Sequence, residues 1–411
     1  MGLLEQRFRE EMAKSKNSTK MEEGVADVLY PTRFLPFDYA NGYIVVVDLP
    51  NGQHYEYNNI GIVDGSANTF IGRAGSGKTS FVLQAAANII RPFPDAVLFF
   101  DDIEGGSNLT RREILTCFTP EEMNNRVVYR NAAISAENFY MRIQTIYDEK
   151  ITHKADYEYD TGLCDTRGNR IYKLVPTVYI LDSLAMLTPE KLTEEEELSG
   201  QMSTTGAAKT NTAVFKRIIP KLKAANIILF VINHINQKVE INPFAKTKAQ
   251  VGWLKPDETM PGGNAAIYTA NNLVRIDDST KLKDSEGLGI NGKIVDFTLV
   301  KTRTNNPGRS VPMVFTYDSG YDDILSLFVF LKSVGAIQSK GAYMNFAGSD
   351  IKFTQKGFKE KLYTDSEFAV EFNRVAYEEL SKMLVKRIPN EEERKSKDSI
   401  ISSIINIGMT H

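Results

Sequence analysis

Short runs of apolar, β-branched and aromatic residues recur along the middle of the chain, and helical or loop sequence separates them. Continuous apolar runs between helices are typical of strands buried in a mostly parallel, twisted sheet. We therefore predict an α/β fold built around such a sheet. We expect YIVVVDL and HYEYNNIGIV to form a β-hairpin. The core strands that we expect are ANTFI, AVLFFDD, VYILD, IILFVIN, LVRID and KIVDFTLVKTR, with SVPMVFTYD as an added edge strand.

The two ends of the chain differ from this middle part. Residues 1–16 have apolar side chains at helical spacing, and a polar linker follows. A helix isolated by a linker cannot bury its apolar stripe alone, so it folds back or docks on a neighbouring subunit. We expect this N-terminal oligomerisation helix and linker over 1–35, a core over 36–325, and a small, mainly helical C-terminal domain and tail over 326–411, where ILSLFVFLKSVGAI reads as a helix.

Composition excludes several classes of protein. Of 411 residues, 42% are hydrophobic and 25% charged, which is an ordinary globular balance. The formal net charge of −3 gives no global basic field, so a nucleic-acid surface has to be local. Cys117 and Cys164 fall in no metal or redox spacing and suit a reducing cytosol. We expect no membrane span and no signal peptide.

The most specific motif is GRAGSGKT at residues 72–79, which matches G-x-x-x-x-G-K-[ST] between a predicted strand and a predicted helix. Its glycines let backbone N–H groups surround phosphate oxygens, and the helix N-terminus adds partial positive charge. Lys78 is expected to reach the β- and γ-phosphates, and Thr79 to ligate Mg²⁺. The alternative is a chance glycine-rich turn. The predicted nucleotide-binding residues are Gly72, Gly75, Ser76, Gly77, Lys78, Thr79 and Ser80.

Acidic residues follow two predicted strands. Asp182 ends VYILD, where a carboxylate holds Mg²⁺ in ATPases with this phosphate loop. Glu104 lies just after AVLFFDD and is a candidate for orienting the attacking water, with Asp101 and Asp102 as competitors. For the acidic residues of FFDDIEGG, the alternative is a solvated acidic turn.

Lys301 and Arg303 lie two residues apart, so on a strand they share one face. One explanation is a solvated edge strand. The other is a pair of cationic side chains that reach the γ-phosphate bound by a neighbouring subunit.

Two segments suggest a second ligand. The polar stretch at about 193–208 joins a core strand to a helix, and 236–263 is long for a loop without regular structure. Basic residues interleaved with aromatic ones suit single-stranded nucleic acid, whereas a disordered insertion or a solvated helix face is the alternative. The candidates are Lys238, Lys246, Lys248 and Trp253 in the second segment, and Lys209, Lys216 and Arg217 on the helix after the first.

His234 ends the strand IILFVIN beside these loops. A single histidine is usually structural, but at the carboxyl end of a core strand it could sense the nucleotide state.

In this order, the motifs resemble the RecA family of homologous recombinases, most closely the UvsX-like recombinases of tailed bacteriophages. PDAVLFFDDIEGG, ILDSLAMLTP, VINHI, PDETMPGGNAAIYTAN and VKTRTNNPG carry the resemblance, across about 30–325. It implies that Glu104 activates water and that His234 couples the γ-phosphate to the second DNA loop. It also implies that Lys301 and Arg303 cross the subunit interface, although arginine at the second position is a mild departure.

The resemblance further implies that Lys209 and Lys216 contact DNA phosphates. It places Gly262, Gly263 and Asn264 at the end of the second loop, and it makes the N-terminal helix a polymerisation segment. Where the family often has an aromatic residue stacked on adenine, this chain has Arg111. The acidic tail of bacterial RecA is missing.

The function that this resemblance implies is ATP- and Mg²⁺-dependent DNA strand exchange. The protein would form a helical filament on single-stranded DNA and then engage duplex DNA, with a single-strand-binding protein and a loader as partners. A phage origin would place it in the cytoplasm of a bacterial host. The alternatives are a hexameric helicase with the same core and an ATP-gated DNA-coating protein with negligible turnover.

Overall fold

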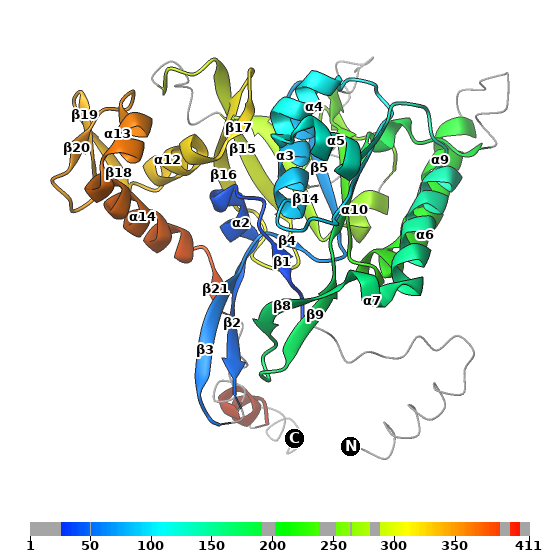
Figure 1. Ribbon diagram of the computed structural model, residues 1–411, viewed down its shortest axis with the longest axis horizontal. Coiled ribbons are helices and arrows are strands. Elements are labelled where there is room, and N and C mark those ends of the chain that lie inside the picture. Colours follow the sequence, from blue (N-terminus) through cyan, green and yellow to red (C-terminus); the bar gives the residue numbers. More distant parts are fainter. Residues whose placement is uncertain are drawn as a thin grey trace, which may run out of the picture.

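The computed structural model describes residues 26–49, 51–190, 202–237, 252–263, 265–279, 288–386 and 395–402. At its centre lies a nine-stranded sheet that is parallel from β14 to β7 and antiparallel from β14 to β17 (Figure 1). In spatial order the strands are β17 (Gly320–Asp322), β16 (Ser310–Thr316), β15 (Gly292–Lys301), β14 (Asn272–Asp278), β5 (Ala67–Gly72), β11 (Ile227–His234), β10 (Thr177–Asp182), β6 (Leu98–Asp102) and β7 (Val127–Arg130).

The predicted α/β fold and mostly parallel sheet are therefore present, and every predicted core strand is a strand. The segment SVPMVFTYD forms β16, but it is not an edge strand because β17 pairs along its outer side.

Both faces of the sheet are covered by apolar helices, which explains the continuous apolar strands. Successive side chains of a strand point to opposite faces. Accordingly Ile180 of β10 belongs to one core cluster, whereas Tyr179 and Leu181 belong to the other. The first cluster includes side chains from α2 (Leu35–Asn41), α3 (Lys78–Ile90), α4 (Leu109–Thr116) and α5 (Pro120–Arg126). The second includes α6 (Ala136–Thr152), α9 (Met202–Ala224) and α10 (Ala265–Thr269).

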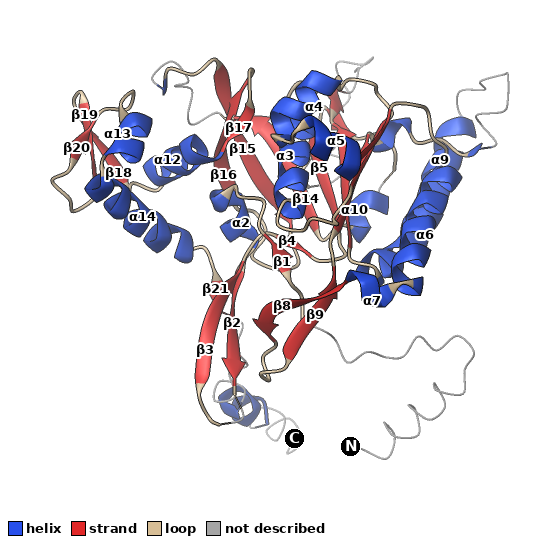
Figure 2. Cartoon of the chain, in the orientation of Figure 1, coloured by secondary structure: helices blue, strands red, loops and turns tan. Residues whose placement is uncertain are grey.

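Smaller sheets extend from this body (Figure 2). The predicted hairpin is present as β2 (Tyr43–Asp48) and β3 (His54–Asn59), but its second strand ends early. The chain bends at Gly61, where φ is +109°. A Cβ atom there would lie 2.2 Å from the Tyr30 carbonyl oxygen, so this bend requires glycine. It continues as β4 (Ile62–Val63), which pairs with β1 (Leu29–Tyr30). A second hairpin, β8 (Glu158–Cys164) with β9 (Arg170–Leu174), was not predicted. The remaining short elements are α7 (Lys154–Tyr157) and η1 (Leu184–Met186).

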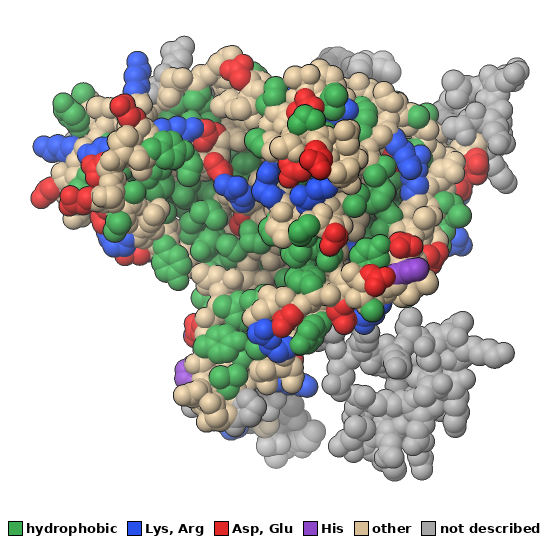
Figure 3. Space-filling model, viewed as in Figure 1, with side chains coloured by type: hydrophobic (Ala, Val, Ile, Leu, Met, Phe, Trp, Pro, Cys, Tyr) green, Lys and Arg blue, Asp and Glu red, His purple; other side chains and the backbone are tan. Residues whose placement is uncertain are grey.

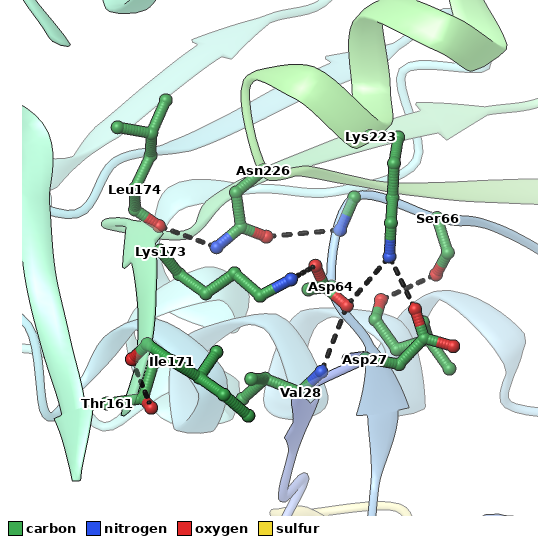
Figure 4. Close-up of polar contacts among 12 residues, drawn as sticks. Asp27, Val28, Asp64, Ser66, Thr161, Ile171, Lys173, Leu174, Lys223 and Asn226 are labelled. Atoms are coloured by element: carbon green, nitrogen blue, oxygen red, sulfur yellow. Dashed lines mark hydrogen bonds and ion pairs between the residues drawn. The ribbon is translucent and has the colours of Figure 1, made fainter. Parts of the chain in front are cut away.

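An ion cluster around the buried Asp64 carboxylate joins several of these elements before the amino end of β5 (Figure 4). The Asp64 side chain is 1% exposed and lies 2.7 Å from Lys173 Nζ and 3.1 Å from Lys223 Nζ. Lys173 lies on β9, and Lys223 lies near the end of α9, where it also pairs with Asp27 at 2.6 Å. Asp64 further accepts a hydrogen bond from the Val28 amide. One carboxylate thus connects the hairpin, α9 and the first described residues.

In its described residues, the C-terminal region contains helices and a small three-stranded sheet. The helix expected from ILSLFVFLKSVGAI is α12 (Asp323–Ser333), and it ends before Gly335, which has φ of +81°. The next residues form a three-stranded sheet of β18 (Ile337–Lys340), β19 (Tyr343–Phe346) and β20 (Lys352–Phe353). The helices α13 (Phe358–Thr364) and α14 (Ser366–Ser381) follow, and β21 (Val385–Lys386) returns to pair with β2.

Several predictions lie outside the described residues, among them the helix over 1–16. In the part of the chain that is described, no helix has both the length and the apolar character needed to cross a membrane. The face drawn in Figure 3 carries Lys and Arg side chains intermixed with Asp and Glu, in keeping with the small net charge.

Candidate nucleotide site and the adjoining loop ends

The phosphate loop connects β5 to α3, as its motif predicts. Gly75 and Gly77 have φ of +72° and +94°, a backbone region that favours glycine. A Cβ atom at Gly75 would meet nothing within 4 Å, whereas one at Gly77 would lie 2.5 Å from the Tyr321 hydroxyl. The first glycine therefore leaves the cradle open, and the second allows the loop to pack on the body of the protein.

Lys78 lies within this cradle. Its side-chain amine donates hydrogen bonds to the carbonyl oxygens of Gly72 at 3.0 Å and Arg73 at 2.9 Å. Burial lowers the pKa of this amine to about 8, although the carboxylates of Asp182 and Glu104 oppose the shift. The buried Ser76 hydroxyl has no hydrogen-bond partner among the described residues. A loop with a buried cation and an unsatisfied hydroxyl fits a bound phosphate group.

Thr79 and Asp182 meet at the carboxyl end of β10. The Thr79 hydroxyl donates to Asp182 Oδ2 at 2.6 Å, and the Asp182 side chain is buried. Burial raises the pKa of this carboxyl to about 6, and the negative charges of Glu104 and Asp102 add to the shift. A hydroxyl and a buried carboxylate beside a phosphate loop are the oxygen ligands that Mg²⁺ prefers. These residues fit the cation, which would neutralise charge on the phosphates.

Three carboxylates near the end of β6 have different surroundings. Asp101 is bound by Arg142 and by the Tyr179 hydroxyl. Asp102 accepts hydrogen bonds from the Ser107 amide and the Tyr129 hydroxyl. Of the three, these contacts leave Glu104 to face the phosphate loop.

Glu104 is in contact with two polar side chains from neighbouring strand ends. Its Oε1 accepts a hydrogen bond from the Ser183 hydroxyl at 2.5 Å and lies 2.7 Å from His234 Nε2. Ligand atoms of Glu104, Asp182 and His234 all lie within 4.8 Å of one another. The structure thus brings the predicted water-orienting, metal-binding and nucleotide-sensing residues together at one edge of the sheet.

The same strand that carries His234 also holds the end of the second predicted loop. The side-chain amide of Asn233 donates through Nδ2 to the Pro261 carbonyl at 2.8 Å. Gly262 and Gly263 have φ of +84° and +79°, and Cβ atoms there would crowd Leu184 and Ala208 at 3.0 and 3.1 Å. Sequence reasoning missed Asn233, although its place directly before a strand-terminal histidine was a usable signal.

The predicted DNA-contacting residues are only partly described. Lys209, Lys216 and Arg217 are exposed on α9, whose opposite side packs into the core through Phe215 and its neighbours. Trp253 is half-buried against the small cluster around Leu254. Lys238, Lys246, Lys248 and Asn264 lie outside the described residues.

Both predicted loops are shorter than expected. The segment expected at about 193–208 includes the start of α9, which begins at Met202. The segment expected to be without regular structure over 236–263 has paired ends. Its first residues form β12 (Asn236–Gln237), which pairs with β13 (Glu258–Thr259).

The predicted cation pair lies away from the chain's own phosphate loop. Lys301 of β15 pairs with Leu273 of β14, and Leu273 pairs with Thr69 of β5. Thr69 precedes Gly72 by three residues, which corresponds to about 10 Å along the strand. Arg303 lies beyond the end of β15, so the prediction that both share a strand face is wrong. Both cations nevertheless reach one carbonyl, that of Tyr268, at 2.8 and 3.5 Å. Burial, and secondarily Arg303, lowers the pKa of Lys301.

Two further cations lie against the phosphate loop or its helix. The Arg111 guanidinium lies 3.4 Å from the Ser80 hydroxyl and donates to the Tyr317 and Asp318 carbonyls. It therefore borders the nucleotide site, where the family resemblance implied an adenine contact. Lys293 donates to the Gly75 carbonyl at 3.1 Å and pairs with Asp278 at 2.6 Å. Sequence reasoning missed Lys293, because it starts a strand far along the chain and matches no motif.

Comparisons with known proteins find relatives over part of the chain. No model of a protein family matches the chain. Over 181 residues it is 28% identical to Protein RecA of Mannheimia haemolytica, which covers 42% of this chain and 43% of the relative. It is 23% identical over 230 residues to Protein RecA of Thermotoga sp. (strain RQ2), covering 55% and 60%. It is 24% identical over 268 residues to the recombination and repair protein of Enterobacteria phage T4, covering 65% and 57%.

These comparisons confirm the resemblance to RecA-family recombinases, those of bacteriophages included. The chain spans less than half the length of the first curated relatives that it matches.

Proposed function

We propose that this protein is an ATP-dependent DNA strand-exchange recombinase that assembles as a helical filament on single-stranded DNA. The observation that carries the proposal is the connection at the end of β11. His234 contacts Glu104 in the nucleotide site, and the adjacent Asn233 holds the end of the second loop through Pro261. Nucleotide chemistry and loop position are thus joined over two consecutive residues.

For hydrolysis, each residue around the loop has a defined task. The phosphate loop and Lys78 would hold the β- and γ-phosphates, and Thr79 and Asp182 would hold Mg²⁺. Glu104 would accept a proton from the attacking water, with Ser183 and His234 fixing the carboxylate. Arg111 would border the base. The assignment of Glu104 rests on its orientation, since Asp101 and Asp102 are bound elsewhere.

For DNA, we propose that α9 and the two loops form one non-sequence-specific surface. The exposed Lys209, Lys216 and Arg217 would contact phosphates. Gly262 and Gly263 pack against η1 and α9, so the end of the second loop and the helix after the first loop would move together. Such a surface leaves recognition of homology to base pairing.

For assembly, the position of Lys301 and Arg303 supports a role between subunits. These cations lie at the opposite end of β5 from their own phosphate loop, so they would reach a nucleotide held by the next protomer. An interface that joins two different surfaces and does not close produces a helix. Bacterial relatives and a phage relative favour a bacterial cytoplasm, with a single-strand-binding protein and a loader as partners.

Electron microscopy tests the proposal. The protein is imaged with single-stranded DNA and Mg²⁺, with and without a non-hydrolysable ATP analogue. Nucleotide-dependent helical filaments are expected, followed by strand exchange when homologous duplex is added. Closed rings threaded on DNA would reject the proposal and indicate a helicase instead. Filaments that never exchange strands would indicate a DNA-coating protein.

A further inference from the structure

A second connection runs from the phosphate loop to the second loop, and it does not involve His234. It begins at Arg73, whose backbone carbonyl accepts a hydrogen bond from Lys78 at 2.9 Å. The Arg73 guanidinium lies 3.7 Å from Glu258 Oε1. The Arg73 side chain is 51% exposed and that of Glu258 is fully buried, so an exposed cation meets a buried carboxylate.

Glu258 lies in the segment that precedes Gly262 and Gly263, and its carboxylate accepts several hydrogen bonds there. Its two oxygens accept hydrogen bonds from Arg275 of β14 at 2.7 and 2.9 Å. Oε2 also accepts from the Lys255 amide at 2.9 Å, and Arg275 donates to the Trp253 carbonyl at 3.0 Å. One buried carboxylate therefore sets the path of residues 252–259 relative to the core sheet.

The starting point of this connection lies where phosphate would bind. Lys78 Nζ donates to the carbonyls of Gly72 and Arg73, which leaves one of its three N–H groups for a phosphate oxygen. Phosphates held in the loop would bring negative charge close to Arg73. That charge would alter the balance between Arg73 and Glu258, because the phosphates would compete for the guanidinium.

We infer that Arg73 is a positioning residue that couples nucleotide occupancy of the phosphate loop to the placement of residues 252–259. The motif G-x-x-x-x-G-K-T does not specify the residue at this position, so the pattern itself does not require an arginine there. The inference rests on the proposed function only in assigning residues 252–259 to a DNA-binding loop.

The first test needs no DNA. Hydrogen exchange of the amides of residues 252–259 is measured in the full chain, with and without a non-hydrolysable ATP analogue and Mg²⁺. In the wild type, we expect nucleotide to change their exchange rates several-fold. Arg73→Gln should abolish most of this change, and Arg73→Lys should retain part of it. Arg374→Gln is the matched control, because that arginine is 49% exposed and pairs with Glu371 and Glu378 far along the chain.

The second test measures linkage. Single-stranded DNA affinity is compared between the nucleotide-bound and nucleotide-free states, and nucleotide affinity is measured without DNA. We expect Arg73→Gln to reduce the nucleotide-dependent gain in DNA affinity at least fivefold when both proteins are saturated with nucleotide. The inference would be overturned if Arg73→Gln kept the full nucleotide-dependent gain in DNA affinity. It would also be overturned if nucleotide did not change the exchange rates of residues 252–259 in the wild type. A wild-type protein that shows the exchange response but binds no DNA would instead reject the proposed function.

Discussion

The surroundings of individual side chains decide their chemistry in this protein. Asp182 and Lys78 lie in one buried site, and burial shifts both toward neutrality, with the pKa of Asp182 raised to about 6 and that of Lys78 lowered to about 8. Charged ligands would reverse both shifts, because phosphate favours the ammonium ion and Mg²⁺ favours the carboxylate. A bound metal–nucleotide complex would therefore stabilise the charged forms of both side chains.

Replacing Glu104 tests the proposed proton acceptor. Glu104→Gln keeps the shape of the side chain and can still contact Ser183 and His234, but it cannot take a proton. We expect DNA-stimulated ATP turnover to fall by about 10²-fold or more, with nucleotide and DNA affinities changed little. Steady-state hydrolysis and equilibrium binding measure these quantities. The exposed Glu121→Gln is the control, and normal turnover in Glu104→Gln would reject the assignment.

A second residue-scale prediction concerns Lys150, whose amine is buried beside a cavity of about 350 Å³. Its nitrogen donates to the Val175 carbonyl and the Thr177 hydroxyl, and burial lowers its pKa to about 7. In the unfolded chain the pKa is near 10.5. The neutral amine is therefore favoured in the folded state, and the associated stability is fully present above pH 10.5 and is lost as the pH falls toward 7.

Lys150→Met should accordingly raise the free energy of unfolding more at pH 7 than at pH 10. The difference between variant and wild type should change by up to about 1.4 kcal/mol per pH unit within that window. Chemical denaturation at several pH values measures it. Lys154→Met changes an exposed lysine nearby and should show no such slope. A flat difference for Lys150→Met would mean that the amine stays charged when folded.

At the scale of elements, short polar connections hold the additions to the core sheet. The hairpin β8–β9, the end of α9 and the residues before β1 share the carboxylate of Asp64. Asn305 similarly joins the C-terminal region to the β2 hairpin, through the carbonyls of Met383 and Gly42. These elements lie far apart in sequence, so single buried polar groups set their relative positions.

Asp64→Asn should destabilise the fold strongly. It leaves Lys173, whose side chain is 9% exposed, without its anionic partner, and breaking such a buried pair costs about 3–5 kcal/mol. Thermal or chemical unfolding measures the loss, and adding Lys173→Met should recover part of it. Asp160→Asn removes an exposed ion pair on the same hairpin and should have a much smaller effect. Equal losses for both variants would contradict a special role for Asp64.

At the scale of the whole molecule, we propose that the active site is completed by two protomers. The phosphate loop and Glu104 follow the carboxyl ends of β5 and β6, whereas Lys301 and Arg303 lie toward the amino ends of β14 and β5. In this arrangement the two cations would act on a nucleotide held by a neighbouring protomer. Turnover should therefore depend on assembly, and a change at one of these two surfaces should be compensated by the intact surface of another protomer.

Mixing two inactive variants tests this arrangement. Lys78→Ala lacks the loop cation, and the double variant Lys301→Ala with Arg303→Ala lacks the cation pair. Each alone should hydrolyse ATP at least tenfold more slowly with DNA present, while an equal mixture should recover part of the activity. The triple variant mixed with the double variant has no intact cation pair and should recover nothing. Failure of the first mixture, with both variants assembled, would place the cations outside the active site.

Local sequence was enough to predict much of this protein. The strands are continuous apolar runs because both faces of the sheet are covered, and the phosphate loop is a contiguous motif whose strand and helix follow from periodicity. Asp182 could be predicted because it ends an apolar strand downstream of that motif. The α/β fold and the candidate nucleotide-binding residues thus depend on residues close together in the chain.

Other features depended on packing between distant segments, and only the tertiary structure decided them. The contacts of Asp101 and Asp102 come from α6, β10 and β7, so no local pattern could show that Glu104 is the carboxylate left facing the site. Lys293 and Glu258 approach the phosphate loop from residues far along the chain. Lys301 and Arg303 lie toward the amino end of β14, away from the phosphate loop, because β15 pairs antiparallel with β14. Strand order and direction set that geometry, and apolar periodicity alone does not encode either one.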